Sequence, residues 1–276
     1  MTAVQSRAAC RNETGDPGVW RRQVARAFSR ASDRYKQLAL AQQKMGEALW
    51  EHLPAHARSV LDLGCGPGHW SRCLAEHYGA DCRVIGLDIA PGMLATAHQS
   101  PSPRVHWLCA DAADLPLADC RVDVAFSNLA IQWCPDLDAI MAELFRVLRP
   151  GGRAVINTLG PGTLQELAHA WSSGDALLPF QSRERHLASA RLAGFGKVQS
   201  SAVSERFHYP DLRAVMASIK GVGAHATRRT VTLTRSDVAR AEKRYEALRE
   251  AAGLPVSYQR LCIVLDKEPT PCPPSS

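Results

Sequence analysis

The sequence predicts an α/β fold built around one doubly wound, mainly parallel sheet. Short apolar segments alternate with helical segments through the middle of the chain, and a glycine-rich turn directly follows the first of them. Right-handed helical crossovers between parallel strands place a ligand crevice at the carboxyl ends of the strands. The expected strands are 59–63, 82–88, 104–108, 122–128 and 153–159, separated by helices near 69–78, 91–98 and 136–148.

Length and composition favour a single well-buried domain. The 276 residues are 46% apolar and 22% charged. No stretch approaches the roughly 18 uninterrupted apolar residues of a membrane helix. We therefore expect a cytoplasmic protein that neither spans nor binds a membrane. The net charge of +6, without clusters of basic and aromatic residues, argues against nucleic acid and favours an acidic partner or substrate.

The cysteines and histidines follow no ligand spacing. The nine cysteines form no C-x-x-C pair, and the ten histidines form no H-E-x-x-H motif. We therefore expect neither a disulfide framework nor a metal site.

Both ends of the chain are polar, and we expect disordered tails at 1–17 and 269–276 around one domain at 18–268. Apolar spacing between Trp20 and Leu53 predicts two helices, broken near Ser32 and Asp33, with Asp33 as the N-cap of the second. Segments 20–52 and 161–193 are expected to form a helical lid. The elements expected after the fifth strand are helices at 163–173, 183–193, 210–219 and 236–251 and strands at 197–207 and 258–266, which complete seven strands.

The glycine-rich turn carries the clearest chemical signal. Leu61 to Gly68 reads D-x-G-x-G-x-G between a strand and a helix, and Asp88 ends the next strand, where it can bind ribose hydroxyls. This arrangement suits NAD or S-adenosylmethionine. The G-x-G-x-G spacing and the acidic Asp62 favour a cationic ligand over a pyrophosphate.

The segments LDLGCGPG and GLDIAPGML resemble motifs I and II of the class I S-adenosylmethionine-dependent methyltransferases. The resemblance implies a Rossmann-like seven-stranded sheet with an antiparallel last strand and S-adenosylmethionine as cofactor. It also implies that Asp111 contacts the adenine amine, with Ala112 beside it, and that the end of the fourth strand lines the methionine side. The expected cofactor-binding residues are Asp62, Gly64, Cys65, Gly66, Gly68, Asp88, Ile89, Met93, Asp111, Ala112, Asn128 and Leu129.

Within that class, AFSRASDRYKQLALAQ (27–42), SNLAIQWC (127–134) and SIKGVGA (218–224) resemble the malonyl-acyl-carrier-protein O-methyltransferases of biotin synthesis. The similarity covers roughly residues 20–266. It implies methyl transfer to the free carboxylate of a malonyl thioester held by an acyl-carrier protein or CoA. The expected catalytic residues are Tyr35, Gln132 and Lys220, and the basic residues expected to meet the carrier are Arg183, Arg185, Lys220, Arg228 and Arg229.

Three other functions are compatible with the glycine turn. The first is a small-molecule, quinone-type C- or O-methyltransferase, which usually needs a general base that the sequence does not clearly offer. The second is a cofactor-binding regulator without turnover, and the third is an NAD-dependent oxidoreductase.

Overall fold

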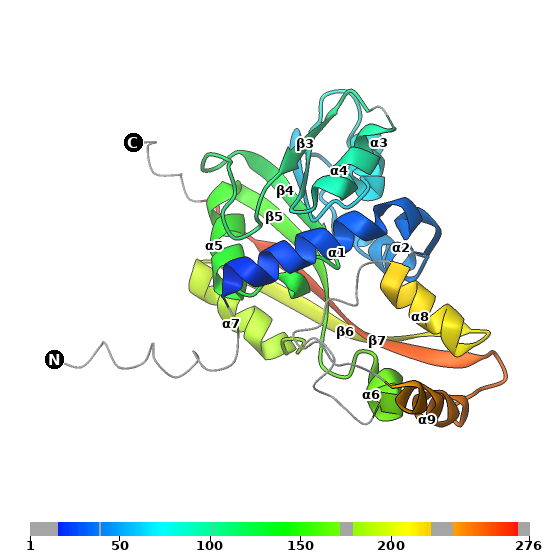
Figure 1. The fold of residues 1–276 in the computed structure, drawn as a ribbon. Helices are drawn as coiled ribbons and strands as arrows, with labels where there is room; N and C mark the ends of the chain where they lie inside the picture. The colour runs from blue at the N-terminus through cyan, green and yellow to red at the C-terminus, as the bar shows by residue number, and fades with distance from the viewer. Residues whose placement is uncertain (1–15, 39, 101, 172–178, 222–233, 270–276) are drawn as a thin grey trace.

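The computed structural model describes residues 16–38, 40–100, 102–171, 179–221 and 234–269, which form a seven-stranded sheet with helices on both faces (Figure 1). The strand order is β3-β2-β1-β4-β5-β7-β6. The strands are β1 (Ser59–Leu63), β2 (Arg83–Asp88), β3 (Val105–Cys109), β4 (Val122–Asn128), β5 (Leu148–Leu159), β6 (Lys197–Tyr209) and β7 (Leu254–Asp266).

The sheet is parallel from β3 to β5, and β7 runs antiparallel to both of its neighbours, β5 and β6. The predicted seven-stranded doubly wound sheet with an antiparallel last strand is therefore confirmed. The chain runs outward from β1 through β2 to β3, and then returns to place β4 on the other side of β1. This reversal puts a topological switch point, where ligands commonly bind, beyond the carboxyl ends of β1 and β4.

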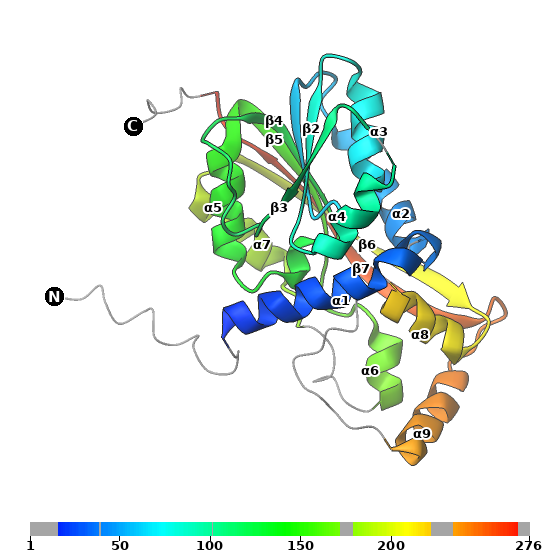
Figure 2. The ribbon, with the colours of Figure 1, turned by 45° about the horizontal axis from the view of Figure 1, so that its top comes forward.

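The helices form a layer on each face of the sheet (Figure 2). On one face α5 packs on the strands through Ile140, Met141 and Leu144, and α7 packs on α5 and β6. On the other face Leu74 and Ala75 of α3 pack against β1 and β2. The helices are α1 (Pro17–Leu38), α2 (Leu40–Glu47), η2 (Trp50–His52), α3 (His69–Tyr78), α4 (Pro91–His98), η3 (Ile131–Trp133), α5 (Leu137–Val147), α6 (Gln165–Trp171), α7 (Arg183–Ala193), α8 (Leu212–Gly221) and α9 (Arg235–Glu246).

A second apolar cluster lies outside the central sheet, where β6 and β7 extend beyond the other strands. Tyr245 of α9 is fully buried there, and its hydroxyl donates to the Pro255 carbonyl at 2.8 Å. Buried Glu166 of α6 accepts from the backbone N–H and the hydroxyl of Ser257, at 3.0 and 2.5 Å. These bonds attach α6 and α9 to the β6–β7 extension.

The predicted helix break near Ser32 and Asp33 is wrong, because α1 continues through both residues to Leu38. The Ser32 hydroxyl donates to the Ser29 carbonyl one turn earlier at 3.0 Å, so the side chain is satisfied inside the helix. Asp33 is consequently not an N-cap, and the second helix begins at Leu40.

The fifth and last strands begin earlier than predicted. β5 starts at Leu148, and Gly151 adopts a φ of +78°. The Gly151 N–H donates to the Lys267 carbonyl and the Lys267 N–H donates to the Gly152 carbonyl, each at 2.9 Å. The end of β7 therefore holds the Pro-Gly-Gly segment in the sheet.

Helix α7 falls within the segment expected to form the lid, but Ala190 of α7 is fully buried in the main core. Helix α7 packs on α5 and β6, so it belongs to the helical layer on one face of the sheet. The expected tails fall mainly at 1–15 and 270–276, outside the described residues. Residues 222–224 of the SIKGVGA segment, Arg228 and Arg229 also lie outside the described residues.

The described residues contain no helix long and apolar enough to cross a membrane, and no group of three metal-ligating side chains. Cys120 is disulfide-bonded, although the spacing of the cysteines predicted no disulfide framework. The free thiols among the described residues belong to Cys65, Cys73, Cys82, Cys109, Cys134 and Cys262.

Candidate active site

The glycine turn between β1 and α3 forms the floor of a cavity at the carboxyl ends of β1, β2 and β4. Gly64, Gly66 and Gly68 have φ values of +75°, +54° and +77°, a region that strongly favours glycine. A Cβ at Gly64 would lie 2.1 Å from the Ala130 Cβ, and one at Gly68 would lie 2.2 Å from the Trp107 ring. A Cβ at Gly66 would meet no atom within 4 Å, so this glycine leaves open space in the cavity.

Asp88 ends β2 and supports the turn. One carboxylate oxygen accepts the Gly66 N–H and the other accepts the Ala90 N–H, each at 2.8 Å. Burial raises the pKa of Asp88, and these backbone N–H groups oppose that rise. Each carboxylate oxygen has a second lone pair, so Asp88 can also accept hydrogen bonds from a ligand in the cavity.

Asp62 lies behind the turn and does not line the cavity. Its side chain is 1% exposed and accepts a hydrogen bond of 2.5 Å from the Ser71 hydroxyl of α3. Burial, together with the nearby Asp88 charge, raises the pKa of Asp62 to about 7. This placement corrects the expectation that the Asp62 carboxylate faces a cationic ligand: it joins β1 to α3 beneath the glycine turn.

The structure gathers most of the other expected cofactor residues around the cavity. Asn128 and Leu129 lie at the end of β4, and the Asn128 amide donates to the Gln42 carbonyl at 2.9 Å. Cys65 and Gly68 do not line the cavity. The expected residues that do line it are Gly64, Gly66, Asp88, Ile89, Met93, Asp111, Ala112, Asn128 and Leu129.

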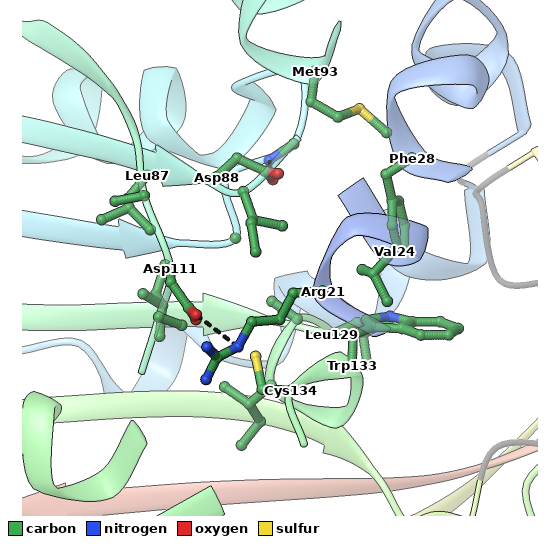
Figure 3. Close-up of a pocket in the computed structure, with 18 of the residues that line it drawn as sticks. Arg21, Val24, Phe28, Leu87, Asp88, Met93, Asp111, Leu129, Trp133 and Cys134 are labelled. Atoms are coloured by element: carbon green, nitrogen blue, oxygen red, sulfur yellow. Dashed lines mark hydrogen bonds and ion pairs between the residues drawn. The ribbon is translucent and has the colours of Figure 1, made fainter. Parts of the chain in front are cut away.

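Helix α1, part of the segment expected to form a lid, supplies one wall of the cavity through residues that the sequence did not single out (Figure 3). Arg21, Val24 and Phe28 lie on one helical face and line the cavity. Nε of Arg21 lies 2.8 Å from Oδ2 of Asp111, as an ion pair without the alignment of a hydrogen bond. The amphipathic spacing of α1 was the available signal, but it did not show which ligand pocket the apolar face covers.

Two contacts fix α1 against neighbouring elements. The Trp20 indole donates to the Trp133 carbonyl at 2.8 Å, and the Phe28 and Trp133 rings meet edge to face with centroids 5.3 Å apart. A Cβ at Gly92 of α4 would lie 2.8 Å from the Ser29 backbone. The absence of a side chain at Gly92 therefore permits close packing between α1 and α4.

Of the three expected catalytic residues, the structure describes the side chain of Gln132 alone. Gln132 lies in η3, donates to the Leu129 carbonyl at 2.8 Å and accepts from the Thr158 hydroxyl at 3.3 Å. These bonds fix its amide next to the cavity wall. Tyr35 lies in α1 and Lys220 in α8, and their side chains are outside the described part of the structure.

The residues around the cavity fit a nucleoside cofactor. Two carboxylates, Asp88 and Asp111, follow adjacent strands and can accept from hydroxyl and amine groups. Apolar side chains, including Ile89 and Met93, line the space between the carboxylates and α1. The open space above Gly66 allows a ligand to approach the backbone closely.

The comparisons with known proteins agree with this geometry. A family profile described as "Methyltransferase domain" matches residues 60–152. Phosphoethanolamine N-methyltransferase 2 from Haemonchus contortus, solved with phosphomonomethylethanolamine and S-adenosylhomocysteine, superposes with a TM-score of 0.59 at 18% identity, covering 90% of this chain and 60% of that one. At this identity the similarity shows the fold alone.

Two curated relatives are closer in sequence. Malonyl-[acyl-carrier protein] O-methyltransferase from Serratia marcescens is 36% identical over 89% of this chain and 95% of its own length. The biotin biosynthesis bifunctional protein BioHC from Cellvibrio japonicus is 38% identical over 92% of this chain. The chain spans about half, 52%, of that bifunctional relative.

The sheet order, the glycine turn and the matched domain define this protein as a methyltransferase. The extent of its similarity to the curated relatives narrows the class further. The chain belongs to the malonyl-[acyl-carrier protein] O-methyltransferase family.

Proposed function

We propose that the protein transfers a methyl group from S-adenosylmethionine to the free carboxylate of a malonyl group on an acyl-carrier protein. The product is the malonyl methyl ester that primes pimelate synthesis for biotin. The observation that carries this proposal is the 36% identity to the Serratia marcescens enzyme over nearly the full length of both chains. Malonyl-CoA is an alternative acceptor with the same reactive group.

The bound cofactor supplies an electrophilic methyl group on a sulfonium ion. We assign the ribose hydroxyls to Asp88, whose oxygens have lone pairs available beside their bonds to Gly66 and Ala90. We assign the adenine amine to Asp111, whose Oδ1 accepts the Ala113 N–H at 3.0 Å. Asn128 and Leu129 line the methionine side.

The acceptor carboxylate needs no general base, because its reference pKa of about 4 leaves it ionised at neutral pH. The cavity fits this requirement, since no histidine is among the described residues that line it. Its two carboxylates are already engaged, Asp88 by backbone N–H groups and Asp111 by Ala113 and Arg21. The protein must instead align the reacting atoms about 3–3.5 Å apart and exclude water.

Tyr35, Gln132 and Lys220 are the proposed catalytic residues. A phenolic O–H from Tyr35 and an amide N–H from Gln132 are donors that orient a carboxylate without protonating it. Gln132 is held in place by Leu129 and Thr158. Lys220, in α8, supplies a positive charge that favours an anionic acceptor. Helix α1 covers the cavity and supports the proposed lid role of the N-terminal helices.

We also propose a cytoplasmic location with the carrier protein as macromolecular partner and without a role for nucleic acid or membrane. The six free thiols among the described cysteines are typical of a reducing compartment, although Cys120 is an exception.

A label-transfer competition tests the proposal. The purified protein receives S-adenosylmethionine labelled in the methyl group together with malonyl-carrier protein, malonyl-CoA and a quinol precursor. We expect label in a malonyl thioester. Label that appears only in the quinol would assign the protein to the quinone-type methyltransferases instead.

A further inference from the structure

The outer face of α1 carries three arginines at regular helical spacing. Arg22, Arg26 and Arg30 follow one another at intervals of four residues, so they share one face of the helix. All three are exposed to solvent. The inner face of the same helix, with Arg21, Val24 and Phe28, lines the cofactor cavity. The helix that closes the active site therefore presents positive charge on the face opposite the cavity.

The positive charge of this arginine face is largely uncompensated. Arg22 lies 4.0 Å from Asp16, and both side chains are more than 60% exposed, so this pair is weak. Within the described residues no ion pair involves Arg26 or Arg30. The helices packed against α1 add no carboxylate: α4 contributes only His98 as a titratable group, and α8 contributes Arg213 and Lys220.

Two of the five basic residues expected from sequence to meet the carrier, Arg183 and Arg185, already bind other parts of the chain. Arg185 makes a two-pronged ion pair with Asp138, at 2.8 and 2.7 Å. Arg183 donates to the hydroxyl and carbonyl of Ser200, at 2.5 and 2.9 Å. These bonds fix α7 to α5 and to β6, which leaves both arginines less available to a partner.

We propose that Arg22, Arg26 and Arg30 form the docking surface for an acidic face of the carrier protein. This inference rests on the proposed function, because it takes the carrier as the source of the acyl group. Docking over α1 places the carrier on the element that separates solvent from the cofactor cavity.

The composition of the arginine face favours a protein over other polyanions. Single-stranded nucleic acid is usually bound by aromatic side chains interleaved with basic ones, and the exposed residues between these arginines include Gln23 but no aromatic ring. A helix that binds an anionic membrane also needs a large exposed apolar face. The apolar residues Val24 and Ala27 of α1 are instead buried against the protein.

The test compares the double variant R26E/R30E with a matched control, R121E/R191E. Arg121 and Arg191 are exposed and lie outside the cavity lining, and the control changes the net charge by the same amount. Each protein is assayed with malonyl-carrier protein and with the small, uncharged-arm substrate malonyl-N-acetylcysteamine. Assays run at about 50 mM and about 500 mM salt, because higher salt screens surface charges.

We expect R26E/R30E to raise KM for the carrier substrate about tenfold or more at low salt, and less at high salt. Its kcat/KM for malonyl-N-acetylcysteamine should stay within about twofold of wild type, because neither arginine lines the cavity. The control should leave both substrates unchanged. An unchanged KM for the carrier, or an equal loss with both substrates, would overturn the proposed docking surface.

Direct titration of unloaded holo-carrier protein separates docking from turnover. Binding by wild type and control but not by R26E/R30E supports the surface, whatever reaction the enzyme performs. If R26E/R30E retains carrier binding, the proposed surface is wrong. It is also wrong if R26E/R30E loses affinity for duplex DNA or anionic vesicles but not for the carrier. Failure of the proposed function has a different signature, since wild type would then methylate neither malonyl substrate.

Discussion

Replacing Gly66 by alanine separates the role of the glycine turn in binding from its role in folding. Gly66 has a φ of +54°, and a Cβ there meets no atom within 4 Å. Alanine therefore costs only the left-handed backbone conformation, about 1–2 kcal/mol. For a domain of this size the expected fall in Tm is about 2–8 °C, so the variant remains folded.

The same Cβ enters the space that we assign to the cofactor. Overpacking a filled site costs ~1–3 kcal/mol, which corresponds to a loss of about 5- to 140-fold in affinity. Isothermal titration with S-adenosylhomocysteine measures that loss, and thermal denaturation measures the change in Tm. We expect a substantial loss of affinity with a small loss of stability.

Gly151→Ala is the matched control. Gly151 has a φ of +78° and also no neighbour within 4 Å of an added Cβ, but it lines a separate recess beside Arg149 and Arg153. The control should lose similar stability and retain full cofactor affinity. If Gly66→Ala bound S-adenosylhomocysteine within twofold of Gly151→Ala, the assignment of the cavity above Gly66 to the cofactor would be wrong.

Three further substitutions test other parts of the account. Tyr35→Phe removes one hydroxyl, so kcat should fall while affinity for S-adenosylhomocysteine stays within about twofold; unchanged turnover in a steady-state assay would exclude a catalytic role. Asp62 has a folded-state pKa of about 7 against a reference value of 3.8, so its ionisation destabilises the folded protein increasingly as pH rises through that interval. Asp62→Asn should therefore gain stability relative to wild type between pH 4.5 and 7.5 in urea unfolding, and a difference that does not change with pH would contradict the raised pKa. Glu166→Ala leaves the N–H and hydroxyl of Ser257 without their buried acceptor, and should lower the free energy of unfolding by about 2–5 kcal/mol; a loss below about 0.5 kcal/mol in denaturant titration would show that this contact contributes little.

The central strands were predictable because their signals are local. Val60, Leu61 and Leu63 of β1 form a short apolar segment, interrupted by Asp62 and ending at Gly64, and the structure places the strand there. The positions of Asp88 and Asn128 at strand ends followed from the same pattern, since parallel strands share one carboxyl edge. These residues accordingly line the cavity.

The errors arose where a distant contact overrides a local signal. Ser32 and Asp33 are typical of a helix start, but the Ser32 hydroxyl bonds within α1 and the helix continues. The Pro-Gly-Gly segment before β5 is typical of a turn, but Lys267 pairs with it from the other end of the chain. Spacing within one segment carries no information about such partners.

At the site, Asp62 and Arg21 also make contacts that local sequence patterns do not reveal. The position of Asp62 in the glycine motif suggested a ligand, and only the packing of Ser71 against it shows that the carboxylate points away from the cavity. Arg21 and Asp111 are 90 residues apart in sequence numbering and meet only because α1 packs across the ends of the strands. Predicting this contact requires the relative placement of α1 and the sheet.

The site of methylation on the acceptor tests the central claim most directly. Malonyl-carrier protein is incubated with the enzyme and S-adenosylmethionine carrying a trideuterated methyl group, and the product is analysed by tandem mass spectrometry before and after mild alkali. An ionised carboxylate acceptor predicts that the label lies on the terminal carboxyl oxygen and is released as methanol by alkali. Label that remains on the central carbon of the malonyl group would require proton removal by a base and would contradict the mechanism.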